Sequence, residues 1–303
     1  MRQMMMLIRR ELIEHRSGWA VTSVFGALFV LAAILAVFGL VRVGLMDGQM
    51  TLAELAEGAD PAAFYPGLQV MLVSIAMVLN LVMTFVVFFY FLDALYAERK
   101  DRSILFWKSL PVSDLQVVGS KYLTGIVAIP LVTVAVFVVT AVLVSLIGGL
   151  ALAWAGAGEA LSVAPAAIAR VTMMLMYSLA FQALWFAPID GWLLLVSAFA
   201  KRAVLGWALL PPVLVVVAER TLLGTTRFAE LLGQRMVGGF ELAFSGEQHS
   251  ILVDEIAIST FPTLGEFFTP GRLLAAPSLW IGIAVGLLFL AGAVWLRRYR
   301  DDS

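Results

Sequence analysis

The sequence contains no cysteine, only two histidines and few charged residues. Without cysteine, disulfides, thiolate metal sites and cysteine nucleophiles are all excluded. A Ser-His-Asp triad would have to use His15 or His249, which lie far apart in the sequence, and no GxSxG or HExxH motif is present. The chain also lacks GxxxxGK[ST], so it cannot bind ATP through a P-loop. No set of catalytic residues is therefore evident.

The shortage of charge is matched by an excess of apolar residues. Only 14% of the 303 residues are charged and 62% are hydrophobic, whereas soluble proteins have about 25% charged and 45–50% apolar residues. A water-soluble core cannot absorb this excess, so we expect a polytopic membrane protein in contact with lipids. The net charge of -1 without a basic stripe argues against nucleic acid as a partner. No long polar linker divides the chain, which predicts a single domain over residues 1–303.

Six apolar runs predict an all-α integral membrane protein with six transmembrane helices. The first run, residues 19–41, would be about 34 Å long as a helix, enough to cross a hydrocarbon core of about 30 Å. Pro188 predicts a kink in the fourth span, and the pair Pro211-Pro212 predicts a bend or break in the fifth. The other five spans are expected at 68–92, 122–150, 171–200, 203–218 and 279–296.

Two segments outside these spans have a mixed polar and apolar pattern. Residues 1–18 carry Arg2, Arg9 and Arg16 at intervals of seven, with apolar residues on another face, which predicts a helix lying in the membrane interface. Residues 219–279 are too polar to span and too apolar for a free loop. We expect short extracellular helices there, lying on or dipping into the outer leaflet, or else a small folded lid.

The distribution of basic residues predicts the orientation of the chain. With six spans both termini lie on one side of the membrane, and that side holds 14 of the 20 lysines and arginines. The positive-inside rule then places both termini and the segment 96–121 in the cytoplasm.

A few polar or helix-breaking residues lie within the predicted spans. Asp190 is costly at this depth unless it is paired or faces water; it could line a cavity or gate, or it could stabilise the break at Pro188, and the sequence leaves both open. Asn80 fits a hydrogen bond between helices better than a place on a substrate path. The pair Pro211-Pro212 suits either a moving gate or a static kink.

The segment 96–121 is a charged island between two apolar runs. A plain solvated loop would not need the apolar residues mixed among its charges, so the composition indicates a docking segment. Its charged residues are Glu98, Arg99, Lys100, Asp101, Arg102, Lys108, Asp114 and Lys121, and its apolar residues include Ile104, Leu105, Phe106, Trp107 and Leu110.

In this setting the stretch ERKDRSILFWKSLPVSDLQVVGSK resembles the integral-membrane subunits of ABC-2 type ABC transporters. The segment TPGRLLAAPSLWIG before the last span and the RRYR ending support the resemblance. It implies an exporter in a bacterial inner membrane, in which two such permease subunits form the substrate path. Each would bind a separate ATPase subunit, which carries the ATP, through a coupling helix in the loop after the second span.

Carried onto this chain, the coupling helix would run from about Asp101 to Leu110. Its apolar anchors would be Ile104, Leu105 and Trp107, with Arg99, Lys100, Arg102 and Lys108 as polar partners. Glu98 and Asp101 are also expected among the residues that couple to the ATPase. The same resemblance implies no cofactor and no catalytic residue on this chain. The alternative is a self-contained secondary transporter or channel that uses Asp190 as a proton or cation site. The sequence does not select a substrate.

Overall fold

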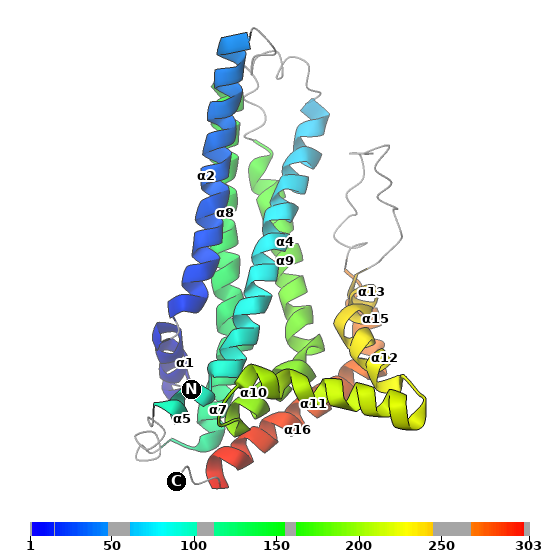
Figure 1. Cartoon of the computed structure of the whole chain (residues 1–303). Coiled ribbons are helices and arrows are strands. Elements are labelled where there is room, and N and C mark those ends of the chain that lie inside the picture. The colour runs from blue at the N-terminus through cyan, green and yellow to red at the C-terminus, as the bar shows by residue number, and fades with distance from the viewer. Residues whose placement is uncertain are drawn as a thin grey trace.

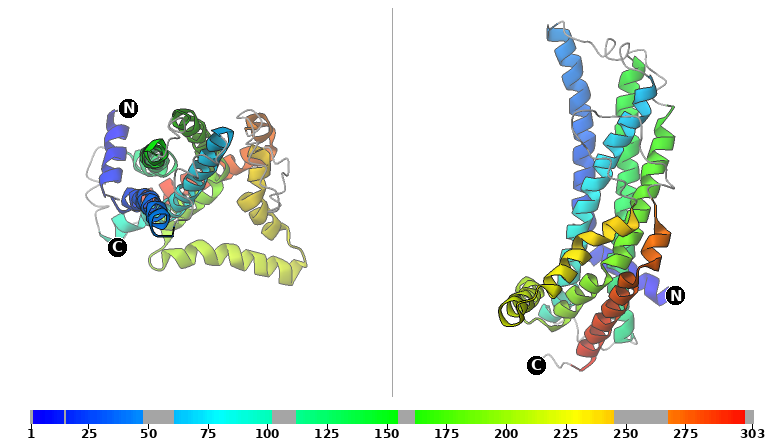
Figure 2. Two further views of the ribbon diagram at one scale, coloured as in Figure 1. Left: turned by 90° about the horizontal axis from the view of Figure 1, so that it is seen from above. Right: turned by 90° about the vertical axis from the view of Figure 1, so that its right-hand side faces the viewer.

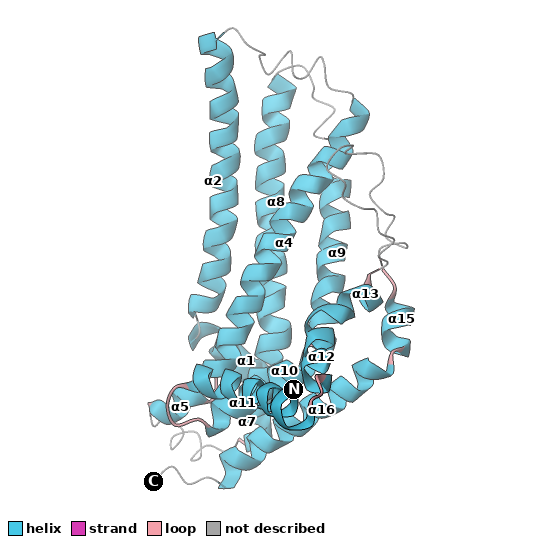
Figure 3. Cartoon of the chain, turned by 45° about the vertical axis from the view of Figure 1, so that its right-hand side comes forward, coloured by secondary structure: helices cyan, strands magenta, loops and turns pink. Residues whose placement is uncertain are grey.

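The computed structural model describes residues 2–14, 16–47, 61–101, 112–154, 162–244 and 268–299. Within these ranges every regular element is a helix (Figure 3), and the one isolated β-bridge joins Phe244 to Phe268. Six helical segments of this part of the chain are long and apolar enough to cross a membrane. The predicted all-α class and the six predicted spans are confirmed at this level.

Four long helices stand side by side as an upright bundle (Figure 1). They are α2 (Arg16–Asp47), α4 (Pro61–Asp93), α8 (Ile129–Trp154) and α9 (Ala164–Trp185). The third span is longer than predicted, because α8 continues from α7 (Asp114–Leu123) through a π-helical turn, Thr124–Ala128. Pro130 is the second residue after this turn, so the helix changes its hydrogen-bond register close to where a proline removes a donor.

Three helices run across one end of the bundle (Figures 1 and 2). They are α10 (Ala187–Phe199), α11 (Val204–Ala218) and α16 (Pro277–Tyr299). The last two contain the predicted fifth and sixth spans, yet they do not lie along the upright helices. Nearly every side chain of α11 is at least partly exposed and most are apolar, so this helix needs lipid or another protein around it.

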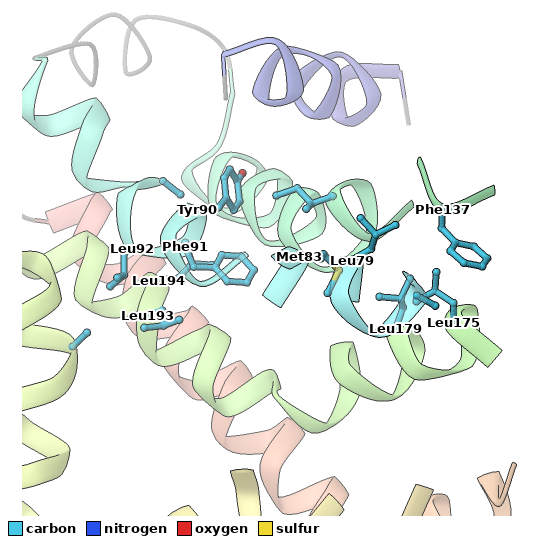
Figure 4. Close-up of a cluster of buried hydrophobic side chains, with 14 of the residues drawn as sticks. Leu79, Met83, Tyr90, Phe91, Leu92, Phe137, Leu175, Leu179, Leu193 and Leu194 are labelled. Carbon is cyan, nitrogen blue, oxygen red and sulfur yellow. The ribbon is translucent and has the colours of Figure 1, made fainter. Parts of the chain in front are cut away.

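The core lies where the upright helices meet α10. Leu79 and Phe91 of α4, Phe137 of α8, Leu175 of α9 and Leu194 of α10 are all buried in one continuous cluster, and Figure 4 shows their side chains together. Dispersion contacts among such tightly packed side chains hold membrane helices together, since lipid tails are as apolar as the side chains themselves. The core therefore joins α10, together with the helices that pack on α10, to the upright bundle.

The predicted fourth span is broken into α9 and α10. Phe186 separates them, and its carbonyl accepts hydrogen bonds from the amides of Ile189 (2.9 Å) and Asp190 (3.0 Å). Pro188, in the first turn of α10, has no amide to continue the ladder from α9. The kink predicted at this proline is therefore confirmed, and it turns the chain from the bundle into the crossing layer.

Short helices fill the space beside the C-terminal half of α9. The indole of Trp185 donates to the carbonyl of Arg235 at 2.7 Å, and the hydroxyl of Tyr177 donates to that of Ala243 at 2.9 Å. Short helices before the last span were predicted; residues 245–267 of this segment lie outside the described ranges. The helices are α12 (Arg227–Gly233), α13 (Gly239–Ala243) and α15 (Pro270–Ala275), with π-helical turns at Glu219–Leu223 and Gln234–Gly238.

Candidate functional site

The central part of the predicted docking segment, residues 102–111, lies outside the described ranges. This part holds Arg102, Ile104, Leu105, Trp107 and Lys108, whose roles stay predictions. Its two ends are described. The N-terminal root is α5 (Tyr96–Lys100) followed by Asp101, and the C-terminal root is α7.

Buried ion pairs tie these two roots together. The ammonium of Lys121 in α7, which is 1% exposed, lies 3.1 Å from Glu98 of α5 and 2.8 Å from Glu11 of α1 (Arg2–Glu14). The guanidinium of Arg297 in α16 contacts Glu98 through Nη1 and lies 3.1 Å from Asp114 through Nε. We call these five residues the charge network: Glu11, Glu98, Asp114, Lys121 and Arg297.

The charge network holds three carboxylates and two cations at the end of the bundle where α1, α5, α7 and α16 meet. The carboxylates outnumber the cations by one. The hydroxyl of Tyr90, a neutral donor, provides a further hydrogen bond of 3.3 Å to Glu11. Buried ions cost several kcal/mol each to desolvate and are tolerated only when their partners are in place. The network therefore fixes the relative positions of four helices that are distant in sequence.

A second set of contacts fixes α5 to the end of α10. Arg99 donates from Nη2 to the backbone carbonyls of Ser197 and Ala200, the latter at 2.9 Å, and these are among the last carbonyls of α10. The Ser197 hydroxyl in turn accepts from the amides of Leu95 and Tyr96, both at 3.0 Å. A cation at a helix C-terminus also interacts favourably with the helix dipole.

A capping box defines where the chain re-enters the bundle after residues 102–111. The Ser113 hydroxyl accepts from the amide of Gln116 at 3.3 Å, and the Gln116 side chain accepts from the amide of Ser113 at 3.1 Å. These reciprocal bonds satisfy two amides that the first turn of α7 leaves without helical partners. The S-x-x-Q pattern within LPVSDLQ was a usable sequence signal for this start.

These contacts change the roles predicted for two residues of the island. Glu98 is 8% exposed and paired within the chain, and Arg99 is part-buried against α10, so both belong to the intramolecular base of the loop. They were predicted among the residues that contact a partner, because sequence alone does not show which charges of an island have internal partners. Lys100 and Asp101 are exposed and remain available.

Asn80 lies in a polar contact between α4 and α9. Its Oδ1 accepts from the side-chain amide of Gln182 at 2.9 Å, and Gln182 accepts in turn from the hydroxyl of Thr84 at 3.4 Å. The geometry is that of a hydrogen bond between two membrane helices, the role that the sequence favoured for Asn80. Gln182 was not singled out from the sequence.

Asp190 is buried in the first turn of α10, where its carboxylate lies close enough to Tyr122 for an electrostatic interaction. Within the described ranges no hydrogen bond or ion pair of this carboxylate is present. Its neighbour Gly191 packs against Gly286 of α16, where an added Cβ would lie 2.6 Å from the Gly286 carbonyl oxygen. Asp190 therefore lies next to the contact between α10 and α16, close to the break at Phe186.

The pair Pro211-Pro212 does not break its helix. α11 continues from Val204 to Ala218 through both prolines, so of the predicted bend or break, the break does not occur. Pro212 has no amide for the carbonyl of Ala208, four residues earlier, and the indole of Trp192 in α10 donates to that carbonyl at 3.0 Å. A side chain from the neighbouring helix replaces the missing donor, as membrane helices require.

We expect Trp192→Phe to lower the free energy of unfolding by about 1–3 kcal/mol, because the Ala208 carbonyl is then left without a donor. Titration with dodecyl sulfate in mixed micelles measures this change. Trp207→Phe, on the exposed side of α11, is the matched control. In Trp192→Phe/Pro212→Ala the amide at 212 returns, so the loss should largely disappear. Equal losses in Trp192→Phe and Trp207→Phe would contradict the assignment.

A known protein family matches the central part of the chain. Residues 62–198 match the family model described as ABC-2 family transporter protein. This match supports an ABC-2 type permease. No curated protein and no solved structure matches the chain. The matched part of the permease runs from α4 to α10, so it includes both roots of the loop, Asn80 and Asp190.

The permease is a membrane transport component and not itself a catalyst. In its described ranges no three His, Asp or Glu side chains gather closely enough to hold a metal ion. The charge network is the feature of the permease that the structure shows and the sequence did not reveal. Sequence reasoning placed Lys121 and Asp114 in the island but assigned no partner to Glu11 or Arg297, because the partners lie 110 or more residues apart.

Proposed function

We propose that this permease is the membrane subunit of a bacterial ABC exporter, driven by a separate ATPase that docks on the loop between α5 and α7. The observation that carries the proposal is the charge network, which clamps both roots of that loop to the bundle. When both roots of a loop are fixed to the bundle, movement of a docked partner displaces the helices. When the roots are free, the same movement displaces only the loop. Family membership itself implies association with an ABC ATPase.

The residues that would contact the ATPase are the exposed and central ones of the island. Lys100 and Asp101 are exposed at the N-terminal root and would contribute charge. Ile104, Leu105 and Trp107 would be the apolar anchors, rimmed by Arg102 and Lys108. Aromatic and aliphatic anchors within a polar rim carry most of the energy of such an interface.

The distribution of charge supports a cytoplasmic position for this end of the bundle. Helices α1, α5, α7 and the C-terminal end of α16 lie at the same end of the bundle (Figure 1). These segments carry lysines and arginines, which is the arrangement expected on the cytoplasmic side. Both termini would then be cytoplasmic, and the membrane would be the bacterial inner membrane. The basic residues described at this end are Arg9, Arg10, Arg99, Lys100, Lys121, Arg297 and Arg298.

ATP would bind to the partner, because this chain has no P-loop. The family typically dimerises, so a second permease, identical or different, would complete the substrate path. The exposed apolar surface of α11 supports such a partner or lipid around this helix.

Co-expression with an ABC ATPase tests the proposal. We expect the ATPase to co-purify with the wild-type permease and to be lost from Leu105→Ala and Trp107→Ala, since hot-spot anchors cost about 2 kcal/mol or more when truncated. The variants should still insert and fold. Leu115→Ala, an exposed leucine just past the loop, is the control that should retain the ATPase. Retention by Trp107→Ala and Leu105→Ala alike would contradict docking on this loop.

A second candidate function rests on Asp190. Its buried carboxylate has no ion pair within the described ranges, as expected of a proton or cation site in a self-contained secondary transporter. Transport by the purified permease without any ATPase, and its loss in Asp190→Asn, would favour this candidate over the ABC exporter.

A further inference from the structure

The last turn of α16 joins both roots of the docking loop through a single side chain. Arg297 contacts Glu98 in α5 with Nη1 and Asp114 in α7 with Nε, so one guanidinium spans the start and the end of the loop. Its side chain is 4% exposed, whereas that of Asp114 is 28% exposed and lies at the edge of the network. The loop is thus closed at its base by the helix that ends the described chain.

The shape of the guanidinium makes the connection between α5, α7 and α16 rigid. A guanidinium is planar and presents its N–H groups in a fixed fork, so two carboxylates bound to it are held at a fixed spacing. Glu98 is in addition bound to Lys121, which binds Glu11 of α1. Any displacement of the loop roots must then carry α1 and α16 along, or separate buried ions from their partners at high cost.

α16 passes from this closure directly to the break in the fourth span. Gly286 lies against the start of α10: a Cβ there would lie 2.6 Å from the carbonyl oxygen of Ala187 and 3.1 Å from the nitrogen of Pro188. Two helices in backbone contact cannot slide without a large rearrangement of their interface. The middle of α16 therefore packs against the start of α10 beside Phe186, where α9 ends and α10 begins.

We propose that Arg297 is a positioning residue that ties the last turn of α16 to the docking loop, beside the Arg99 contacts that tie α5 to α10, so that α1, α5, α7 and α16 move as one unit. The inference rests on the proposed function for the source of the movement, the ATPase. Its structural part, the rigid connection of α5 to α16, holds for the permease alone.

Spin labels test the connection, because the chain has no cysteine to remove. Cysteines replace Ala97, which is partly exposed in α5, and the exposed Tyr299 in α16, with the exposed Val139 in α8 as a reference on the upright bundle. Pulsed EPR distances are measured on the complex with the co-purified ATPase, without nucleotide and with trapped ATP. We expect the distance from Ala97 to Tyr299 to stay the same, while both labels move relative to Val139.

Arg297→Gln should break this behaviour. The label in α5 should still move with nucleotide, whereas the label at the end of α16 should follow it only in part, because α10 and the Arg99 contacts still connect α16 to α5. The distance between the labels should broaden and shift by up to about 5 Å, the size of a one-turn slip. Arg298→Gln is the matched control, because Arg298 is the exposed next residue of the same helix. Arg297→Lys should be intermediate, since one ammonium cannot reproduce the fork.

Three outcomes would overturn the inference: the label in α16 follows α5 in Arg297→Gln as fully as it does in the wild type, the Ala97–Tyr299 distance changes with nucleotide in the wild type, or neither label moves. If no ATPase co-purifies, the proposed function fails, and the comparison of Arg297→Gln with Arg298→Gln on the permease alone still decides the rigid connection. Should Arg297→Gln not fold, Asp114→Asn removes only one of the two partners and should broaden the same distance.

Discussion

Replacing Lys121 with methionine is expected to lower the free energy of unfolding by about 3–5 kcal/mol, the cost of breaking a buried ion pair by removing one partner. The ammonium of Lys121 is 2.8 Å from Glu11 and 3.1 Å from Glu98. Methionine fills a similar volume, so the loss arises from charge and not from a cavity. Glu98 keeps Arg297 as a partner, whereas Glu11 keeps only the hydroxyl of Tyr90 among the contacts described above.

The measurement is unfolding by dodecyl sulfate in mixed micelles, followed by tryptophan fluorescence. Lys201→Met, at an exposed lysine in the turn between α10 and α11, is the control for loss of a positive charge. A double-mutant cycle sharpens the test, because Lys121→Met/Glu11→Gln also removes the charge of the carboxylate that Lys121 bound at 2.8 Å and should recover part of the loss. If Lys121→Met were as stable as Lys201→Met, the charge network would not stabilise the fold.

The spans could be predicted because each is a local property of the sequence. Twenty or so consecutive apolar residues define a membrane helix without reference to the rest of the chain, and the runs at 68–92 and 279–296 correspond to α4 and α16. The break at Pro188 was predictable for the same reason, since a missing amide acts on its own helix.

The charge network and the fate of Pro211-Pro212 depend on residues far away in the sequence. Glu98 looked like a solvated partner-facing charge because its cations, Lys121 and Arg297, come close only in the folded chain. The proline pair looked like a break because the donor that replaces the amide of Pro212, the indole of Trp192, belongs to another helix. A single sequence shows which charged and polar side chains are present. Which of them pair with one another depends on how the helices pack.

Gly286→Leu is expected to separate α10 from α16, because its Cβ would lie 2.6 Å from the carbonyl oxygen and 2.8 Å from the carbonyl carbon of Ala187. Overpacking a well-filled contact costs about 1–3 kcal/mol, and here the obstacle is backbone, which cannot rotate away. Gly148→Leu in α8 is the matched control, since a Cβ at Gly148 meets no atom within 4 Å. Both changes gain the same helix propensity over glycine, about 0.8–1 kcal/mol, which the comparison cancels.

Cross-linking reports the separation directly. A Cβ at Gly292 would lie 3.2 Å from Cδ1 of Leu195, so cysteines at Leu195 and Gly292 of the cysteine-free chain lie within reach of a short bifunctional reagent. The cross-link should form in the wild-type background and in Gly148→Leu, and it should be lost in Gly286→Leu. A Gly286→Leu permease that cross-links as fast as the control would show that α10 and α16 do not depend on this glycine contact. Loss of the cross-link would place the break at Phe186 and the last helix in one mechanical unit, because backbone contact at Gly286 is what holds them together.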